Sequence, residues 1–267
     1  MTRDLKIKNW SYWRNFPSKK PQNLILLLHG CGGNAGDILS LAPMLAERMK
    51  AVSFVAVAPD GFLRSVEKND GYQWFDIENN YHPELFSKPV EELTQKELQM
   101  FDNMVKGENG LFKTSEALNT FLNFCQEKFD VSNSKTSIIG WSQGGMTALD
   151  TALSRTEKVK KVISISGGLI PPFADVLRER KASNPEVVLI HGTKDDIISF
   201  KAAKQTEVIL RRENIPVHLI RRNGMSHGRG EEATVFWTEN AKDIAAELLE
   251  EQSFTRNLKL RRTAAER

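Results

Sequence analysis

The sequence has few of the residues that mark several large classes of protein. Its 267 residues include only two cysteines, Cys31 and Cys125, which are too few for a disulfide scaffold or a cysteine-rich metal site. The 17 glycines and 10 prolines exclude a collagen-like or low-complexity chain. No apolar run approaches the roughly 20 residues that span a bilayer, and the charged residues 1–16 lack the apolar core of a secretory signal. We therefore expect a cytoplasmic protein with reduced thiols, no metal and no stable membrane insertion.

The chain also has little net charge. Its 37 Lys+Arg residues exceed its 34 Asp+Glu residues by three, which gives no electrostatic reason to expect nucleic acid as the main partner. Apolar residues at 40% and charged residues at 27% are close to the averages of globular proteins. A packed core is therefore expected.

Short aliphatic runs alternate with longer amphipathic segments along the chain. Helical spacing of apolar residues is clear in residues 113–129 and around Ile244 and Leu248. Repeated strand and helix is typical of a mostly parallel sheet covered on both faces. We predict a single α/β domain over residues 1–251, with strands in residues 24–28, 53–57, 136–139, 159–165, 187–190 and 217–220.

Two segments fall outside this minimal pattern. Between Asp76 and Thr136 no convincing strand is found, and a helix is predicted over residues 90–105. Residues 77–110 therefore form an expected insertion, which is either a lid over a site or an inert surface excursion. The basic tail, residues 252–267, is expected to be flexible, with weak contact to anionic lipid surfaces as the alternative.

The strongest local signal follows the predicted strand 136–139 and precedes a helical segment. It reads Gly140-Trp141-Ser142-Gln143-Gly144-Gly145. A Gly-x-Ser-x-Gly string between a strand and a helix is typical of a tight turn that exposes a nucleophilic serine hydroxyl. The same turn places the Gln143 amide at a helix N-terminus, where it can hold a developing oxyanion. The alternative is a glycine-rich turn whose serine only caps the helix.

A serine nucleophile requires a base, and the base requires an orienting group. Among the five histidines, His227 is the best candidate base because it lies in a loop between the last predicted strand and the last helix. Asp195 and Asp196 follow the preceding strand, and an acid there completes the order Ser, Asp, His of α/β-hydrolases. The residues alone leave these two aspartates undistinguished. Structural roles are expected for the other histidines, His29, His82, His191 and His218.

The loop after the first predicted strand supplies further amides. It reads His29-Gly30-Cys31-Gly32-Gly33-Asn34, and its glycines let backbone amides approach a substrate oxygen. The Cys31 amide is the candidate second oxyanion donor. Nucleotide binding is not favoured, because neither a following Gly-Lys-Ser/Thr nor the full Gly-x-Gly-x-x-Gly spacing is present.

Taken together, these residues resemble the phospholipase/carboxylesterase family of α/β-hydrolases, which includes acyl-protein thioesterases and lysophospholipase-like esterases. The resemblance rests on His29-Gly30-x-Gly32, Trp74-Phe75-Asp76, the serine turn, Ser166-Gly167-Gly168-Leu169-Ile170-Pro171, His191-Gly192-x-x-Asp195 and Gly224-Met225-Ser226-His227. It implies that Ser142 is the nucleophile, His227 the base and Asp195 the orienting acid. It also implies that the amides of Cys31 and Gln143 form the oxyanion hole.

The sequence therefore predicts a serine esterase or thioesterase that works through an acyl-serine intermediate and requires no cofactor. Its substrate would be a small-molecule or lipid ester, or an acylated protein. The apolar residues nearest the motifs are the expected acyl pocket: Trp74, Phe75, Trp141, Leu169 and Met225. A serine peptidase of similar fold and a non-catalytic binding module are the alternatives.

Overall fold

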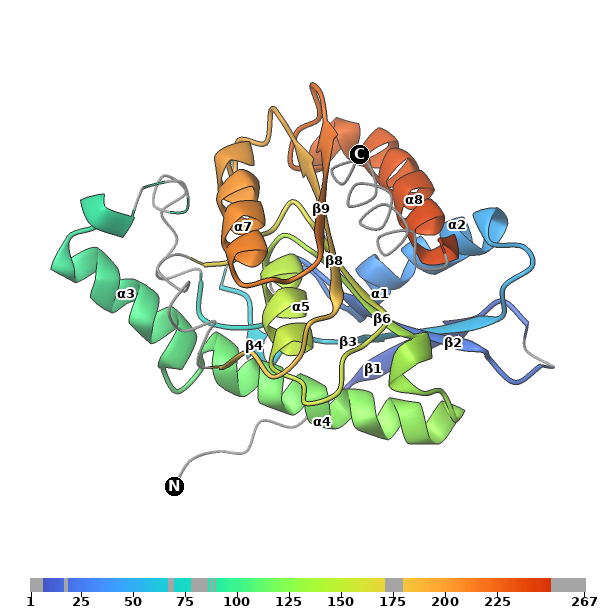
Figure 1. Ribbon diagram of the computed structural model, residues 1–267. Coiled ribbons are helices and arrows are strands. Elements are labelled where there is room, and N and C mark those ends of the chain that lie inside the picture. Colours follow the sequence, from blue (N-terminus) through green and yellow to red (C-terminus); the bar gives the residue numbers. More distant parts are fainter. Residues whose placement is uncertain are drawn as a thin grey trace, which may run out of the picture.

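A seven-stranded sheet forms the centre of the computed structural model, which describes residues 7–16, 19–66, 70–77, 86, 88, 90–170 and 180–250 (Figure 1). The strand order is β1-β3-β2-β6-β7-β8-β9. Six strands are parallel, and only β1 runs antiparallel to its neighbour β3. The strands are β1 (Trp10–Arg14), β2 (Asn23–Leu28), β3 (Phe54–Pro59), β6 (Thr136–Trp141), β7 (Lys161–Ile165), β8 (Glu186–Gly192) and β9 (Val217–Arg222). A separate ribbon pairs β4 (Leu63–Arg64) with β5 (Tyr72–Gln73).

The central strands are buried on both sides, which explains why their sequences are continuously apolar rather than alternating. In β2, Leu24, Leu26 and Leu28 belong to one apolar cluster, and the intervening Ile25 and Leu27 belong to a second cluster. Successive side chains of a strand point to opposite faces. The sheet therefore separates two hydrophobic cores.

Helices cover both faces of the sheet (Figure 1). One face is covered by α1 (Ala35–Leu39), α2 (Leu41–Arg48) and α8 (Ala233–Leu249). The other face is covered by α4 (Leu111–Phe129), α5 (Gln143–Leu153) and α7 (Phe200–Arg212), with α3 (Gln95–Lys106) packed on α4. Short 3-10 turns are η2 (Val90–Glu92), η3 (Asn133–Lys135) and η4 (Gly230–Glu232). The predicted mostly parallel sheet between two helical layers is confirmed.

Each predicted strand is present, and the differences lie at the edges. The prediction missed β1, an aromatic strand at the edge of the sheet, which pairs with β3 in the described part of the chain. The strand predicted over residues 159–165 begins at Lys161, and the helix predicted over residues 113–129 begins at Leu111. The helix predicted over residues 90–105 was too long, because a 3-10 turn precedes α3. Thr94 and Glu97 form the capping box that fixes the start of α3.

The lid and the tail were predicted in parts of the chain that the structure describes only partly or not at all. Residues 78–85, 87, 89 and 251–267 lie outside the described residues, so both remain predictions. The described part of the insertion, helix α3, buries Phe101, Met104 and Val105 in the core that it shares with α4.

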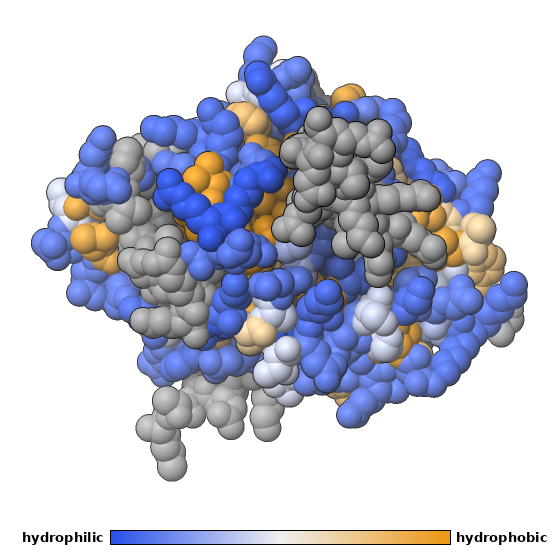
Figure 2. All heavy atoms as spheres, in the orientation of Figure 1, coloured by the Kyte–Doolittle hydropathy of each residue, from blue (hydrophilic) through white to orange (hydrophobic). Residues whose placement is uncertain are grey.

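Polar side chains cover most of the surface in Figure 2, and hydrophobic side chains occur in separate small patches. Among residues 7–250, in the parts that the structure describes, no helix is both long and apolar enough to cross a bilayer.

Candidate active site

Ser142 lies in a strained turn between β6 and α5. Its backbone has φ 56° and ψ −122°, a conformation that a non-glycine residue adopts only when its surroundings impose it. Here the surroundings are closely packed backbone. A Cβ atom on Gly140 would lie 2.0 Å from the Gly144 carbonyl oxygen, and one on Gly144 would lie 2.2 Å from the Leu28 carbonyl oxygen. The two glycines of the sequence string are therefore required by this turn.

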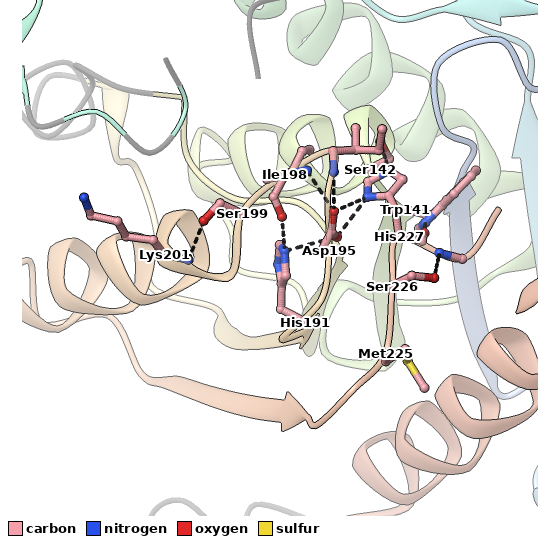
Figure 3. A network of polar contacts seen from close by, with 12 residues as sticks. Trp141, Ser142, His191, Asp195, Ile198, Ser199, Lys201, Met225, Ser226 and His227 are labelled. Carbon is pink, nitrogen blue, oxygen red and sulfur yellow. Dashed lines mark hydrogen bonds and ion pairs between the residues drawn. The ribbon is translucent and has the colours of Figure 1, made fainter. Parts of the chain in front are cut away.

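Three side chains from separate loops form one line of hydrogen bonds (Figure 3). His227 Nε2 lies 2.9 Å from Ser142 Oγ, and His227 Nδ1 lies 2.9 Å from each carboxylate oxygen of Asp195. All three side chains are buried, with Ser142 5% exposed and His227 1% exposed. The structure thus brings together the serine, the histidine and one of the two aspartates that the sequence singles out. Each follows the carboxyl end of a parallel strand: β6, β9 and β8.

The Asp195 carboxylate has four hydrogen-bond donors. The amides of Ile197 and Ile198 donate to Oδ1 at 3.0 Å and 2.8 Å, and His191 Nε2 lies 3.2 Å from Oδ2. The fourth donor is His227. Burial opposes ionisation, but the hydrogen bonds from His191 and His227 outweigh it and hold the pKa of Asp195 below its usual range. Asp195 is therefore a carboxylate in its folded surroundings.

The neighbouring Asp196 is exposed and stands apart from this arrangement. Asp196 does not cap the following helix, because Ser199 is the N-cap of α7 and its hydroxyl accepts a hydrogen bond from the Lys201 amide at 3.1 Å.

The predicted oxyanion donors belong to two different turns. Gln143 is the first residue of α5, and the first amides of a helix have no acceptor within the helix. Its side chain is also bound, because Oε1 accepts from the Trp74 amide at 3.0 Å and Nε2 donates to the Phe75 carbonyl at 2.7 Å. Cys31 lies in a turn that is fixed by two backbone hydrogen bonds, from Gly32 to Tyr72 and from Gly33 to Gly30.

The five residues of the expected acyl pocket do not gather in one place. Trp74 and Phe75 are 0% exposed and pack in the core below α4 and α5, where Leu169 packs against the same cluster. Trp141 and Met225 lie with the apolar cluster on the opposite face of the sheet. In Figure 3 the Met225 side chain points away from Ser142, toward α8, where its sulfur lies 3.8 Å from Asn240 Nδ2. Adjacency to motifs in sequence did not predict which apolar side chains face the site.

A cavity of about 460 Å³ instead lies beside Trp141. Its walls come from the turn after β2 and from α1, from the loop after His227, and from α8, which contributes Ala233 and Trp237. The indole rings of Trp141 and Trp237 meet edge to face, with centroids 5.6 Å apart. The sequence analysis missed Trp237, because its contact with Trp141 depends on how α8 packs on the sheet.

Three of the histidines assigned structural roles lie in the described part of the chain, whereas His82 lies outside it. Buried His29 accepts a hydrogen bond from the Gly61 amide at 3.0 Å, and burial lowers its pKa. His218 pairs with Glu247 at 3.1 Å, and this hydrogen bond raises the pKa of His218. His191 differs from the expectation in one respect, since it contacts Asp195.

Comparison with known proteins places this geometry in a family. The model of the phospholipase/carboxylesterase family matches residues 15–235, which is most of the chain. The chain belongs to the phospholipase/carboxylesterase family. Membership confirms the resemblance predicted from the sequence, the α/β-hydrolase fold and the assignment as a serine esterase.

Relatives within the phospholipase/carboxylesterase family differ considerably in sequence. Acyl-protein thioesterase 1 of Debaryomyces hansenii is 27% identical over 228 residues, which are 80% of this chain and 88% of the relative. Esterase YpfH of Escherichia coli is 24% identical over 194 residues, which are 70% of this chain and 68% of the relative. Among crystal structures, esterase PE8 has a TM-score of 0.68 at 24% identity, covering 87% of this chain and 95% of that one. Zea mays acyl-protein thioesterase 2 has a TM-score of 0.57 at 18% identity, with 90% and 99% covered.

Proposed function

We propose that this protein hydrolyses carboxylic esters or thioesters through an acyl intermediate on Ser142, with His227 as the general base and Asp195 as its orienting acid. The observation that carries the proposal is the unbroken line of hydrogen bonds from Ser142 Oγ through His227 to Asp195. A serine hydroxyl is a weak nucleophile at neutral pH, and such a base activates it.

In the first half-reaction, Ser142 Oγ attacks the carbonyl carbon while His227 Nε2 takes the hydroxyl proton. The tetrahedral intermediate then collapses, the bond to the alcohol or thiol breaks, and His227 returns the proton to the leaving oxygen or sulfur. In the second half-reaction, a water gives its proton to His227 and attacks the acyl-serine. The second tetrahedral intermediate collapses, the bond to Ser142 Oγ breaks, and His227 returns the proton to that oxygen as the carboxylic acid leaves.

Asp195 supports both steps without exchanging a proton. Its hydrogen bond to Nδ1 keeps the hydrogen of the ring on that atom, so that Nε2 faces Ser142 as an acceptor. Since the pKa of Asp195 is held below its usual range, the carboxylate stays charged and stabilises the imidazolium that forms during each step. The amides of Gln143 and Cys31 are the proposed donors to the oxyanion.

The names of the relatives support the proposed substrate class. Relatives named acyl-protein thioesterase favour an acylated protein as one substrate, and the esterases among them favour small-molecule or lipid esters. Of the five side chains predicted for an acyl pocket, only Trp141 lines the cavity beside the site. A cytoplasmic location is also proposed, because Cys31 and Cys125 form no disulfide with each other.

The proposal is tested with a panel of p-nitrophenyl esters and matched thioesters of increasing acyl length. We expect the wild-type protein to hydrolyse short members of both series, and Ser142→Ala to lose about 10⁴-fold or more of that activity. Ser132→Ala, which changes an exposed serine far from this turn, is the control and should retain full activity. A Ser142→Ala variant with a tenth of the wild-type rate would refute the assignment of the nucleophile.

A further inference from the structure

We propose that the cavity beside Trp141 binds the alcohol or thiol part of the ester, and that Arg229 makes it prefer leaving groups that carry a carboxylate or a phosphate. This inference rests on the proposed ester hydrolysis. The cavity is lined by Gly30 and Cys31 on one side, by Gly228 and Arg229 on another, and by Ala233 and Trp237 of α8.

Two residues that line the cavity adjoin triad residues in the chain. Trp141 immediately precedes Ser142, and Gly228 immediately follows His227. A Cβ atom on Gly30 would lie 3.4 Å from Ser142 Cβ and only 2.6 Å from the Trp141 ring. Glycine at this position therefore lets the Trp141 indole and Ser142 pack directly against the turn after β2, which also lines the cavity.

The direction of proton transfer decides which part of the ester faces the cavity. His227 Nε2 must donate its proton to the leaving oxygen or sulfur, so that atom must come within hydrogen-bond reach of Nε2. Groups attached to the leaving atom then extend along the residues that follow His227. These residues, Gly228 and Arg229, form one wall of the cavity.

The walls are mostly apolar, and one of them carries the cation Arg229. Arg229 is exposed, and within the described residues its guanidinium has no ion-pair partner. The acid on the opposite wall, Asp37, is used in the capping box of α1, where its carboxylate accepts from the Asn34 amide at 3.1 Å. His29 lies behind this wall with its pKa lowered by burial. An arginine guanidinium binds carboxylate or phosphate through paired hydrogen bonds.

Glu232, three residues after Arg229, is engaged elsewhere. Its carboxylate accepts a hydrogen bond from the Ser226 hydroxyl. The indoles of Trp141 and Trp237 present flat apolar surface to the same space. An aryl alcohol with an anionic substituent therefore matches the cavity in both shape and charge.

The test compares two series of esters on the full-length protein. In the first series the acyl group is always acetate and the alcohol is phenol, 3-hydroxybenzoate, its methyl ester, or hydroxybenzyl phosphate. In the second series the alcohol is always phenol and the acyl chain grows from acetyl to octanoyl. The variants are Arg229→Gln and Ala233→Trp, with Val235→Trp as the control on the exposed face of α8.

We expect Arg229→Gln to lower kcat/KM for the carboxylate and phosphate esters about tenfold and to change phenyl acetate and the methyl ester less than twofold. Ala233→Trp should lower kcat/KM for all the aryl acetates relative to methyl acetate, which is added as a reference with a small alcohol, and should leave the acyl-length profile unchanged. Val235→Trp should change neither series.

Equal effects of Arg229→Gln on charged and uncharged esters would overturn the role of Arg229. A change of acyl-length preference in Ala233→Trp would reassign the cavity to the acyl chain. If the wild-type protein fails to hydrolyse even phenyl acetate, the proposed function fails instead, so the two failures are distinguishable.

A separate observation concerns the histidine beside the triad acid. We infer that His191 is a positioning residue that fixes the plane of the Asp195 carboxylate. His191 is 1% exposed, and its Nε2 lies 2.7 Å from the Ile198 carbonyl oxygen and 3.2 Å from Asp195 Oδ2 (Figure 3). The carbonyl is an acceptor, so Nε2 carries the hydrogen and shares it between the two oxygens.

The two oxygens of Asp195 are held in different ways. Oδ1 accepts from the amides of Ile197 and Ile198, which belong to the same loop. His227 Nδ1 contacts both oxygens, and His191 is the further donor to Oδ2 in the described structure. Because His191 stands at the end of β8, it ties the orientation of the carboxylate to the sheet itself. Without it, the carboxylate could rotate away from His227 Nδ1.

Two substitutions separate positioning from packing. His191→Leu fills the space without a donor, and His191→Gln keeps an N–H near the position of Nε2. We expect His191→Leu to lower kcat about 10- to 100-fold with KM changed less than twofold, well below the roughly 10⁴-fold effect of losing a triad acid. His191→Gln should restore most of kcat.

The second readout is the downfield proton resonance of the His227–Asp195 hydrogen bond, which should shift or broaden in His191→Leu and return in His191→Gln. His218→Gln is the control histidine, since His218 pairs with Glu247 away from the triad. A folded His191→Leu with normal kcat would overturn the inference. So would equal loss of kcat in the Leu and Gln variants with the proton resonance unchanged.

Discussion

His227 Nδ1 lies 2.9 Å from both carboxylate oxygens of Asp195, whereas the adjacent Asp196 side chain is exposed. Two neighbouring carboxylates that composition cannot distinguish thus have different surroundings. We expect Asp195→Asn to fold and to lose about 10⁴-fold in turnover, because an amide favours the wrong imidazole tautomer. Steady-state hydrolysis of phenyl acetate measures this loss.

Asp196→Asn is the matched control, one residue away. It should keep its turnover within about twofold. Substitutions of exposed residues seldom change the free energy of unfolding by more than about 0.5 kcal/mol. The reverse order of the two variants would move the acid to Asp196, and normal rates in both would remove this loop from the mechanism.

The pH dependence of hydrolysis tests the charge of Asp195. The Asp195 carboxylate must be ionised to hold the hydrogen of the His227 ring on Nδ1. Asp195 should add no ionisation to the kcat/KM profile above about pH 4, the ordinary value for aspartate, because its folded pKa lies lower. A step in kcat/KM above about pH 4 that disappears in Asp195→Asn would contradict the lowered pKa.

The same shift affects stability in acid. The folded pKa of Asp195 lies below the unfolded value, so its ionised form stabilises the fold at pH values above about 3.9, the unfolded pKa. That contribution is lost as the pH falls through the folded pKa. Urea unfolding of the wild type and Asp195→Asn should therefore differ most at neutral pH and converge in strong acid.

Gly144→Ala tests the packing that forms the serine turn. The added methyl would lie 2.2 Å and 2.4 Å from the carbonyl oxygens of Leu28 and His29, which belong to rigid backbone at the end of β2. We expect a loss of about 1–3 kcal/mol or more in the free energy of unfolding, together with loss of activity. Gly36→Ala is the control, because its added methyl would meet only the movable side chain of Asn34 at 3.1 Å. Similar unfolding curves for both variants would contradict this account of the turn.

The variant Lys161→Met tests a buried charge network at the end of the sheet opposite to the triad. The Lys161 ammonium is 1% exposed and contacts Glu247 at 2.7 Å and Glu186 at 3.1 Å. Lys161→Met leaves the Glu247 carboxylate without its buried cation, and we expect unfolding to require about 3–5 kcal/mol less free energy. The exposed pair of Lys242 and Glu239 supplies the control, Lys242→Met, which should cost at most about 1 kcal/mol.

The activity of folded Lys161→Met should stay normal, because Lys161 begins β7 and the triad follows the far ends of the strands. The double variant Lys161→Met/Glu247→Leu should recover part of the lost stability, since it also removes the unpaired carboxylate. A single variant as stable as the wild type would mean that the network contributes nothing to the fold.

The sequence predicted the central strands well because each is a continuous aliphatic run, buried on both faces. It missed β1, whose aromatic and charged residues carry no aliphatic run and which is stabilised by pairing with β3. Ser142 and His227 were predictable because each belongs to a short loop next to a strong strand pattern. The family resemblance was needed to choose Asp195 over Asp196.

Features that depend on tertiary packing could not be predicted from the sequence. Trp237 contacts Trp141 because α8 packs on the sheet. Trp74 is buried in the core, where it donates hydrogen bonds to the Gln143 side chain and to the His29 carbonyl. A signal for the role of His191 was present in its spacing of four residues from Asp195. That spacing became informative only when the loop conformation placed Nε2 beside the carboxylate.

The central claim, an activated Ser142, is tested most directly by intact-mass measurement after incubation with a fluorophosphonate. The account predicts one added phosphonyl group on the wild-type protein, mapped to Ser142 by peptide analysis, and none on Ser142→Ala. Asp195→Asn should be labelled much more slowly than Asp196→Asn. An unlabelled wild-type protein, or equal labelling of Ser142→Ala, would contradict the account.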